Sequence, residues 1–447
     1  MTRWRVVFGC ALVLALLAGH VLRDSPGYMV HNPDGTTTGD ITHYVYWTRL
    51  VTLGGIQSAY SGTWPETYAV YPPVTLYPLE VIGSAYRWLQ DPSFDPSQAQ
   101  ASLWLHEAIK FAALTWHLLT ACALFLIGAR LSNNERLAAI AASLYVLNPA
   151  AVFDVAHWAQ PDGAHSLFSV VSIGLLGLGQ VLVPWVAIAA AVLAKPQAWS
   201  IVPLLAIATA RAHGVTALLR GVAVAGLASL FITLPFFLTG HGRELLSLPG
   251  TISSVMPVVS ADAHNFWWLL LQPRGEDPLF VQDAARALGP LSYRVVAAGL
   301  VGAVMLVTIW LYWTRRAGLA EAAALGVLGW FTFTTQAHEN HVFFALPLLS
   351  LAWPTRRWLL APFGVLTLTL FLNMFLHDQL LLESLGRGIH DPGIEQLRLV
   401  NAGLNVACCL GWGLWAALRT PAAARASATV TYWPRHPTPV GLEVTSD

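Results

Sequence analysis

The chain has 447 residues, of which 55% are hydrophobic and only 11% are charged, and its formal net charge is zero. Its mean hydropathy is +0.56, which excludes an ordinary soluble domain and predicts a polytopic membrane protein. Lysine occurs only at Lys110 and Lys195, so nucleic acid is not an expected partner. All four cysteines lie inside apolar runs, which predicts neither a disulfide framework nor paired metal ligands.

The N-terminus resembles a signal peptide, because Arg3 and Arg5 precede an apolar run. The sequence Ala-Gly-His at 18–20 is a poor cleavage site, and many apolar segments follow. We therefore predict an uncleaved first transmembrane helix over 1–22.

A long outer loop is predicted over 23–105, and residues 39–77 are its most distinctive part. Aromatic residues that favour the membrane–water boundary are dense here: Tyr44, Tyr46, Trp47, Tyr60, Trp64, Tyr68, Tyr71 and Tyr77. From Asp40 onward the apolar or aromatic positions follow helical spacing: Ile41, Tyr44, Val45, Trp47, Thr48 and Val51. We predict an interfacial helix with Asp40 at its N-terminus.

The rest of the chain is predicted to form a transmembrane bundle over 106–418, with a second outer loop over 239–291 and a cytoplasmic tail over 419–447. This gives an all-α membrane protein with about twelve spans. The expected spans are 4–22, 106–128, 136–152, 165–180, 182–194, 197–210, 217–238, 292–313, 319–335, 342–353, 357–376 and 398–418.

The charges of the short loops indicate the orientation. Arginine pairs at 315–316 and 356–357 fall in loops on one side, which predicts that this side and both termini are cytoplasmic. Most other conspicuous polar residues then lie on the outer face. We expect a site at that face of a multi-pass plasma-membrane protein, rather than a conduction path.

Two motifs of the first outer loop each allow a functional and a simple structural interpretation. Asp40 is either a general base for an acceptor hydroxyl or a helix N-cap. Tyr71-Pro72-Pro73 fixes the entry into a helix, and a functional role requires Tyr71 to face a cleft.

The segment His157-Trp158-Ala159-Gln160-Pro161-Asp162 contains a stacking ring, an amide and an acid, which suit a sugar. Two nearby acids, Asp154 and Asp162, could bind a divalent cation or sugar hydroxyls, or Asp162 could cap the next helix. In Lys195-Pro196-Gln197 an ionisable group interrupts an apolar stretch. Lys195 therefore either binds a lipid phosphate or snorkels at the end of a span.

Two later motifs complete the set of candidates. In His264-Asn265-Phe266-Trp267-Trp268, the paired tryptophans are typical of an interfacial anchor, and Asn265 is the candidate substrate contact. In His338-Glu339-Asn340-His341, the histidines at i and i+3 would share a helix face. Zinc proteases need i and i+4, so we favour phosphate binding over a metal.

Together these motifs resemble the GT-C glycosyltransferases, which use polyprenyl-phosphate-linked sugars. Asp40 matches the acid of their first outer loop, and Tyr71-Pro72-Pro73 matches a common Tyr-Pro-Pro. Trp158 to Asp162 is similar to Trp-Gly-Gln-x-Asp with Ala159 for glycine, and Lys195-Pro196-Gln197 matches Lys-Pro-Gln. His338-Glu339 matches a late His-Glu-Lys or His-Glu-Arg, except that Asn340 replaces the basic residue.

The resemblance implies a GT-C fold and an inverting transfer of a mannose- or glucose-like hexose to a hydroxyl of a glycan, lipid or protein, without a cofactor or required metal. Asp40 would be the catalytic base, and Lys195, His338 and His341 would hold the donor phosphate. The expected substrate contacts are Tyr71, Trp158, Gln160, Asp162, Gln197, Asn265 and Glu339. The alternatives are a flippase or transporter for lipid-linked sugars and a glycan ligase or polymerase.

Overall fold

The computed structural model describes residues 2–22, 25–31, 37–63 and 66–420. Trp64 and the predicted tail beyond residue 420 lie outside these ranges. Most of the regular structure is helical, as predicted. The described residues also contain two small antiparallel sheets, in which β1 (Met29–His31) pairs with β2 (Thr37–Gly39) and β3 (Arg286–Leu288) pairs with β4 (Leu291–Ser292).

Every apolar segment that was expected to span the membrane contains a helix. These helices are α1 (Arg3–Leu22), α5 (Leu103–Ser132), α6 (Glu135–Val146), α8 (Asp162–Gly177), α9 (Leu182–Val192), α10 (Val202–His213), α11 (Val215–Leu238), α14 (Tyr293–Trp313), α15 (Leu319–Phe333), α16 (Ala345–Ala352), α17 (Leu360–Phe375) and α19 (Pro392–Leu418).

The chain is a multi-pass membrane protein. Within the described ranges, six helices are long and apolar enough to cross a bilayer: α1, α5, α11, α14, α17 together with the 3₁₀ turn η5 (Arg357–Leu359), and α19. A seventh span results if α6 and the segment 149–157 count as one, although they are bent by 46°. The bend has a local cause, because Asn148 caps α7 (Pro149–Val152) and Pro149 cannot continue the preceding helix. The predicted number of twelve spans stays a prediction.

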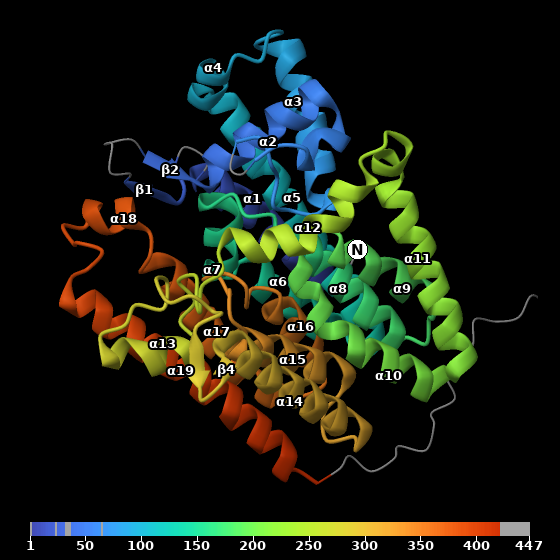
Figure 1. Cartoon of the computed structure of the whole chain (residues 1–447). Coiled ribbons are helices and arrows are strands. Elements are labelled where there is room, and N and C mark those ends of the chain that lie inside the picture. Colours follow the sequence, from blue (N-terminus) through green and yellow to red (C-terminus); the bar gives the residue numbers. More distant parts are fainter. Residues whose placement is uncertain (1, 23–24, 32–36, 64–65, 421–447) are drawn as a thin grey trace, which may run out of the picture.

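The first predicted outer loop folds into a helical cap (Figure 1, top). It contains α2 (Asp40–Gly54), η1 (Ile56–Tyr60), α3 (Pro73–Leu89) and α4 (Pro96–Ala101). The face predicted for α2 is confirmed, because its buried residues are those that the spacing singled out. The entry at the prolines is also confirmed, since Pro72 is the N-cap of α3.

The second predicted outer loop contains α12 (Gly242–Val255), α13 (Phe266–Leu271), the turn η4 (Gln272–Arg274) and the sheet of β3 and β4. A further short helix, α18 (Gln379–Ser384), lies between α17 and α19. Trp267 and Trp268 are buried inside the protein, so their interpretation as an interfacial anchor is wrong. Phe266 and Tyr293 pack against Trp267, and the rings of His264 and His377 pack against Trp268.

Basic residues assigned to the cytoplasmic side pair with acids from distant parts of the chain. Arg5 at the start of α1 pairs with Glu135 at the start of α6, at 2.8 Å. Arg356 and Arg419 both face Glu321 near the start of α15, at 2.5 and 3.8 Å. The acid Asp40 follows the opposite end of α1, which at 20 residues is about 30 Å long. The assignment of Asp40 to the outer face, and of the basic residues to the cytoplasmic face, remains a prediction.

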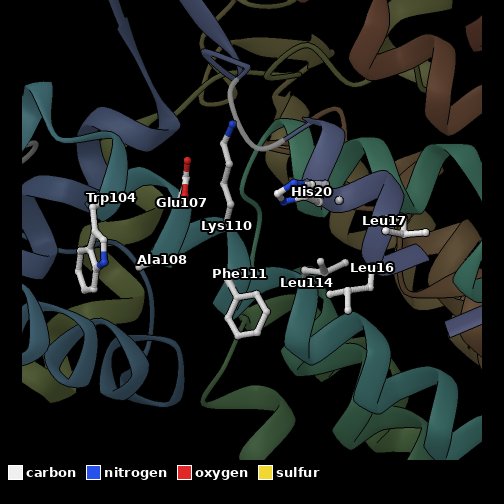
Figure 2. Close-up of a pocket in the computed structure, with 11 residues that line it drawn as sticks. Leu16, Leu17, His20, Trp104, Glu107, Ala108, Lys110, Phe111 and Leu114 are labelled. Carbon is white, nitrogen blue, oxygen red and sulfur yellow. The ribbon is translucent and has the colours of Figure 1, made fainter. Parts of the chain in front are cut away.

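A side cavity of about 510 Å³ lies between α1 and α5 (Figure 2). Leu16 and Leu17 of α1 line it opposite Phe111 and Leu114 of α5. Gly19 permits this close approach of the helices, because a Cβ atom there would lie 2.5 Å from a methyl carbon of Leu114. Both helices are candidate spans, so the cavity lies between two helices that are long and apolar enough to cross a bilayer.

Candidate active site

A second cavity, of about 490 Å³, brings together most of the polar residues that the sequence singled out. Its walls come from the cap helix α2, the loop before α3, Gln160, the residues 195–197 and the loops around 256–262 and 334–341. The predicted residues that line it are Asp40, Tyr71, Gln160, Lys195, Gln197, His338, Glu339 and His341. Stretches of sequence separated by up to 300 residues thus form one polar site.

Asp40 turns its carboxylate into this cavity. It is the first residue of α2, and the N-cap is Gly39, without a capping side chain. The Asp40 carboxylate accepts a hydrogen bond of 2.6 Å from the Gln160 Nε2 atom. The alternative role of Asp40 as a helix cap is therefore not what the structure shows. Only glycine fits before it, since a Cβ atom at Gly39 would lie 1.8 Å from the carbonyl oxygen of Tyr28.

The surroundings of Asp40 favour a base that works near neutral pH. Burial raises the pKa of Asp40 from 3.8 to about 6, although the hydrogen bond from Gln160 and the charge of Lys195 act in the opposite direction. Asp40 is then ionised at pH 7 to 8 and still basic enough to accept a proton. A general base is most effective when its pKa lies close to the working pH.

Gln160 connects the acid to the aromatic residues of the cap. Its Oε1 atom accepts hydrogen bonds from the hydroxyls of Tyr44 and Tyr71, at 3.1 and 3.0 Å, while its Nε2 atom donates to Asp40. Because hydroxyl donors meet Oε1 and a carboxylate meets Nε2, the orientation of the amide is fixed. Tyr71 thus faces the cleft, as its functional interpretation requires.

Ala159, the residue before Gln160, stands where the family pattern has glycine. Ala159 has a φ of 63°, in the left-handed region that glycine adopts without steric cost. A glycine at this position of the Trp-Gly-Gln-x-Asp pattern would adopt this conformation without strain. Alanine tolerates the same turn at a cost of roughly 1–2 kcal/mol.

Behind Gln160 lies a buried network of charges. The Lys195 Nζ atom lies 2.8 and 2.9 Å from the two carboxylate oxygens of Asp162. Asn340 donates from its Nδ2 atom to Asp162 at 2.9 Å and to Asp154 at 3.2 Å. Asp162 is the first residue of α8 and provides no side-chain cap, so its predicted capping role is not observed.

The network includes Lys195, one of the residues predicted to hold the donor phosphate. Lys195 is 1% exposed, so it is not a snorkelling lysine, and its charge is already matched by Asp162. Its Nζ atom also lies 5.2 Å from the centre of the Tyr71 ring. Lys195 lines the cavity, and its contact with a phosphate stays a prediction.

His338 and His341 lie in a turn after α15 and not on a helix, so the prediction of a shared helix face is wrong. The backbone N–H of His338 donates to the His341 Nδ1 atom at 3.1 Å, which closes the turn. Burial lowers the pKa of both histidines. They would therefore meet a phosphate as neutral hydrogen-bond donors at pH 7.

Two other predicted substrate contacts, Trp158 and Asn265, form hydrogen bonds within the protein. Trp158 is 1% exposed, donates from Nε1 to Asp378 at 3.1 Å and packs against Tyr28. Asn265 is buried and caps α13 by accepting a hydrogen bond from the backbone N–H of Trp267. Neither is among the residues that line the cavity, and their roles in substrate binding stay predictions.

Two residues that the sequence reasoning left without a role also line the cavity, namely Tyr28 and Asp262. Asp262 lies in the second predicted outer loop, where its side chain is partly exposed. Its position among the polar residues of the outer side was the only signal. The backbone conformation that directs it to the cavity, with a φ of 62°, has no counterpart in the sequence pattern.

Comparisons with known proteins add evidence on the fold. No protein-family model matches the chain, and no curated protein matches its sequence. Among solved structures, the chain resembles ArnT from Cupriavidus metallidurans, which was crystallised bound to undecaprenyl phosphate. The TM-score is 0.50 and the identity 14%, over 93% of this chain and 78% of that chain. At this identity the likeness concerns the fold, and it confirms the GT-C fold that the motifs predicted.

Proposed function

We propose that the chain is an inverting glycosyltransferase that moves one monosaccharide from a polyprenyl-phosphate carrier to an acceptor hydroxyl at the outer face of the plasma membrane. The observation that carries this proposal is the position of Asp40. Its carboxylate faces a polar cavity, is held by Gln160 and has a pKa of about 6. A mannose- or glucose-like hexose is the sugar we favour.

The proposed reaction is a single displacement. Asp40 takes the proton of the acceptor hydroxyl while the acceptor oxygen bonds to the anomeric carbon. The bond between that carbon and the phosphate oxygen breaks on the opposite side, so the configuration inverts and polyprenyl phosphate leaves. Lys195, His338 and His341 line the same cavity and would donate hydrogen bonds to the leaving phosphate.

The lipid-linked donor is supported by two independent features. The related fold of ArnT was crystallised with undecaprenyl phosphate, a lipid of the proposed class. The described residues contain at least six candidate spans, which suits an enzyme whose substrate keeps its tail in the bilayer. Glycan, lipid and protein acceptors all provide the hydroxyl that the mechanism needs.

The proposal can be tested with purified protein in detergent. Short-chain prenyl phosphates that carry single radiolabelled hexoses are incubated with simple hydroxyl acceptors, and the release of prenyl phosphate is followed together with sugar transfer. We expect transfer with inversion at the anomeric carbon, which NMR of the product shows. A product with retained configuration would contradict the displacement mechanism, and a lack of binding and transfer with every donor would contradict the function.

A further inference from the structure

Asp262 has a backbone conformation that costs energy and is held in place from two helices. Its φ of 62° is unusual for a residue with a side chain, and strain of this kind, roughly 1–3 kcal/mol, is concentrated at functional sites. Asn373 of α17 donates to the carbonyl oxygen of Asp262 at 2.7 Å and accepts from the backbone N–H of His264 at 2.9 Å. Asn405 of α19 donates to the His264 carbonyl oxygen at 2.9 Å. The loop is thus fixed where Asp262 reaches the cavity.

A buried row of side chains lies behind Asp262, and we call it the histidine chain. Asn401 of α19 meets His264 at 2.9 Å, and the Nε2 atoms of His264 and His377 are 2.9 Å apart. The His377 Nδ1 atom lies 3.4 Å from the Asp262 Oδ1 atom. Asn401, His264 and His377 are each at most 4% exposed, so the histidine chain is shielded from solvent and ends at the cavity.

The positions of the hydrogen atoms along the histidine chain follow from one contact with the backbone. The Asn401 Nδ2 atom is 2.9 Å from the carbonyl oxygen of Thr369, which only accepts, so this atom is the amide nitrogen. Its second hydrogen is donated to His264 Nδ1, which leaves the His264 proton on Nε2. That proton is donated to His377 Nε2, so the proton of His377 resides on Nδ1, on the side of Asp262. Burial lowers the pKa of both histidines, which agrees with two neutral rings.

The neighbours of Asp262 in the cavity determine which ligand group it suits. Asp262 forms a backbone bridge with His338, next to the acid Glu339, which is 8% exposed. Burial raises the pKa of Asp262 from 3.8 to about 7, so Asp262 carries its charge above that pH. Burial and the charge of Asp262 raise the pKa of Glu339 well above its usual value. A phosphate would be repelled at this position. Hydroxyl groups would instead donate to Asp262 and accept from Glu339.

We propose that Asp262 binds hydroxyl groups of the transferred sugar, and that His377, His264 and Asn401 are positioning residues that direct a proton donor towards its carboxylate. This inference rests on the proposed function and adds a specificity-determining residue to it. The donor phosphate is expected at His338 and His341, and the sugar is attached directly to that phosphate. Asp262 is bridged to His338, so the sugar ring would lie within its reach.

The first test uses Asp262→Asn, which preserves the shape but replaces a charged acceptor by an amide. We expect kcat/KM for the hexose donor to fall by about 10- to 100-fold, the effect of losing a hydrogen bond to a charged group. The loss should shrink with a donor that lacks the contacted hydroxyl, and deoxy and fluoro donors locate it. The control Glu276→Gln removes an exposed acid of the same loop and should leave kcat/KM unchanged.

The second test examines the histidine chain without any substrate. In protein labelled with ¹⁵N-histidine, NMR should show His264 protonated at Nε2 and His377 protonated at Nδ1, with assignments from His264→Gln and His377→Gln. Charged rings or the opposite tautomers would contradict the proton positions assigned along the histidine chain.

The outcomes separate the inference from the function on which it rests. If the wild-type protein transfers sugar and Asp262→Asn does so with equal efficiency and equal discrimination among deoxy donors, the inference is wrong and the glycosyltransferase proposal stands. If the wild-type protein neither binds nor transfers any prenyl-phosphate hexose, both are wrong. Thermal unfolding of Asp262→Asn, measured alongside, shows whether a loss of activity reflects a loss of folded protein.

Discussion

Replacing Asp40 by asparagine separates its chemistry from its structural contacts. The amide oxygen of the new side chain can still accept the hydrogen bond that Gln160 donates to Asp40 at 2.6 Å, and the N-cap of α2 is Gly39, so the helix keeps its start. What is lost is the base. We expect the turnover rate to fall by about 10²–10⁴-fold at pH 8, which corresponds to roughly 3–5 kcal/mol of activation free energy.

The same substitution should not destabilise the protein, and the direction of the change in stability follows from the pKa of Asp40. Folding raises the pKa of Asp40 from 3.8 to about 6, which corresponds to about 3 kcal/mol against the ionised form. The folded state therefore binds more protons between these values, and the stability of the wild type falls as the pH rises from about 4 to 6. An asparagine carries no such cost, so the Asp40→Asn variant should unfold at an equal or higher temperature at pH 8 and lose that advantage near pH 4.

The assay is the release of prenyl phosphate from a short-chain prenyl-phosphate hexose by purified protein. For the wild type, kcat/KM should rise with pH and level off above an apparent pKa near 6. Asp95→Asn is the matched control, because Asp95 caps α4 and accepts hydrogen bonds from the backbone N–H groups of Ser97 and Gln98, as asparagine also can. Near-normal turnover of Asp40→Asn at pH 8 would refute the assignment, and Asp162 or Asp154 would be examined next.

Three further predictions concern the network, the backbone and the topology. Lys195→Met leaves the charge of Asp162 buried without its partner and should destabilise the protein by about 3–5 kcal/mol. Addition of Asp162→Asn should restore most of this stability, so donor affinity is compared between the double variant and Asp162→Asn alone, and is expected to be about 10- to 100-fold lower in the double variant. Ala159→Gly should raise the stability by up to about 1 kcal/mol, because it relieves a left-handed φ; a lower unfolding temperature would contradict this. Cysteine labelling from outside should reach position Thr63 and miss Gly318, and the reverse pattern would invert the topology.

The sequence was sufficient for features that depend on neighbours along the chain. The helix from Asp40 and its buried face follow from a periodicity of 3.6 residues, and the start of α3 follows from Pro72 and Pro73. The grouping of Gln160 with Lys195 was anticipated from motif order and from one common membrane side. Apolar segments were recognised equally well, but their length as helices, and hence the number of spans, depends on bends and tilts.

Features that depend on partners distant in sequence could not be predicted. The ion pair of Lys195 with Asp162 and the amide of Asn340 between two acids arise from the packing of separate helices. The turn at His338 could not be told from a helix, because a spacing of three residues fits both. The position of Asp262 depends on its backbone conformation and on contacts from α17 and α19, which leave no periodic signal.

The last helix of the described residues, α19, has a consequence for how the protein assembles during synthesis. Near its middle, Asn401 and Asn405 hold His264 behind the cavity. At its other end, the carbonyl oxygens of Ala417 and Arg419 accept hydrogen bonds from Arg316. Both contacts require residues that leave the ribosome after every other described helix has been made. A nascent chain that stops before Pro392 would thus contain Asp40, Gln160 and Lys195 and the contact of Asn373 with Asp262, but it would lack the contacts that α19 makes with His264.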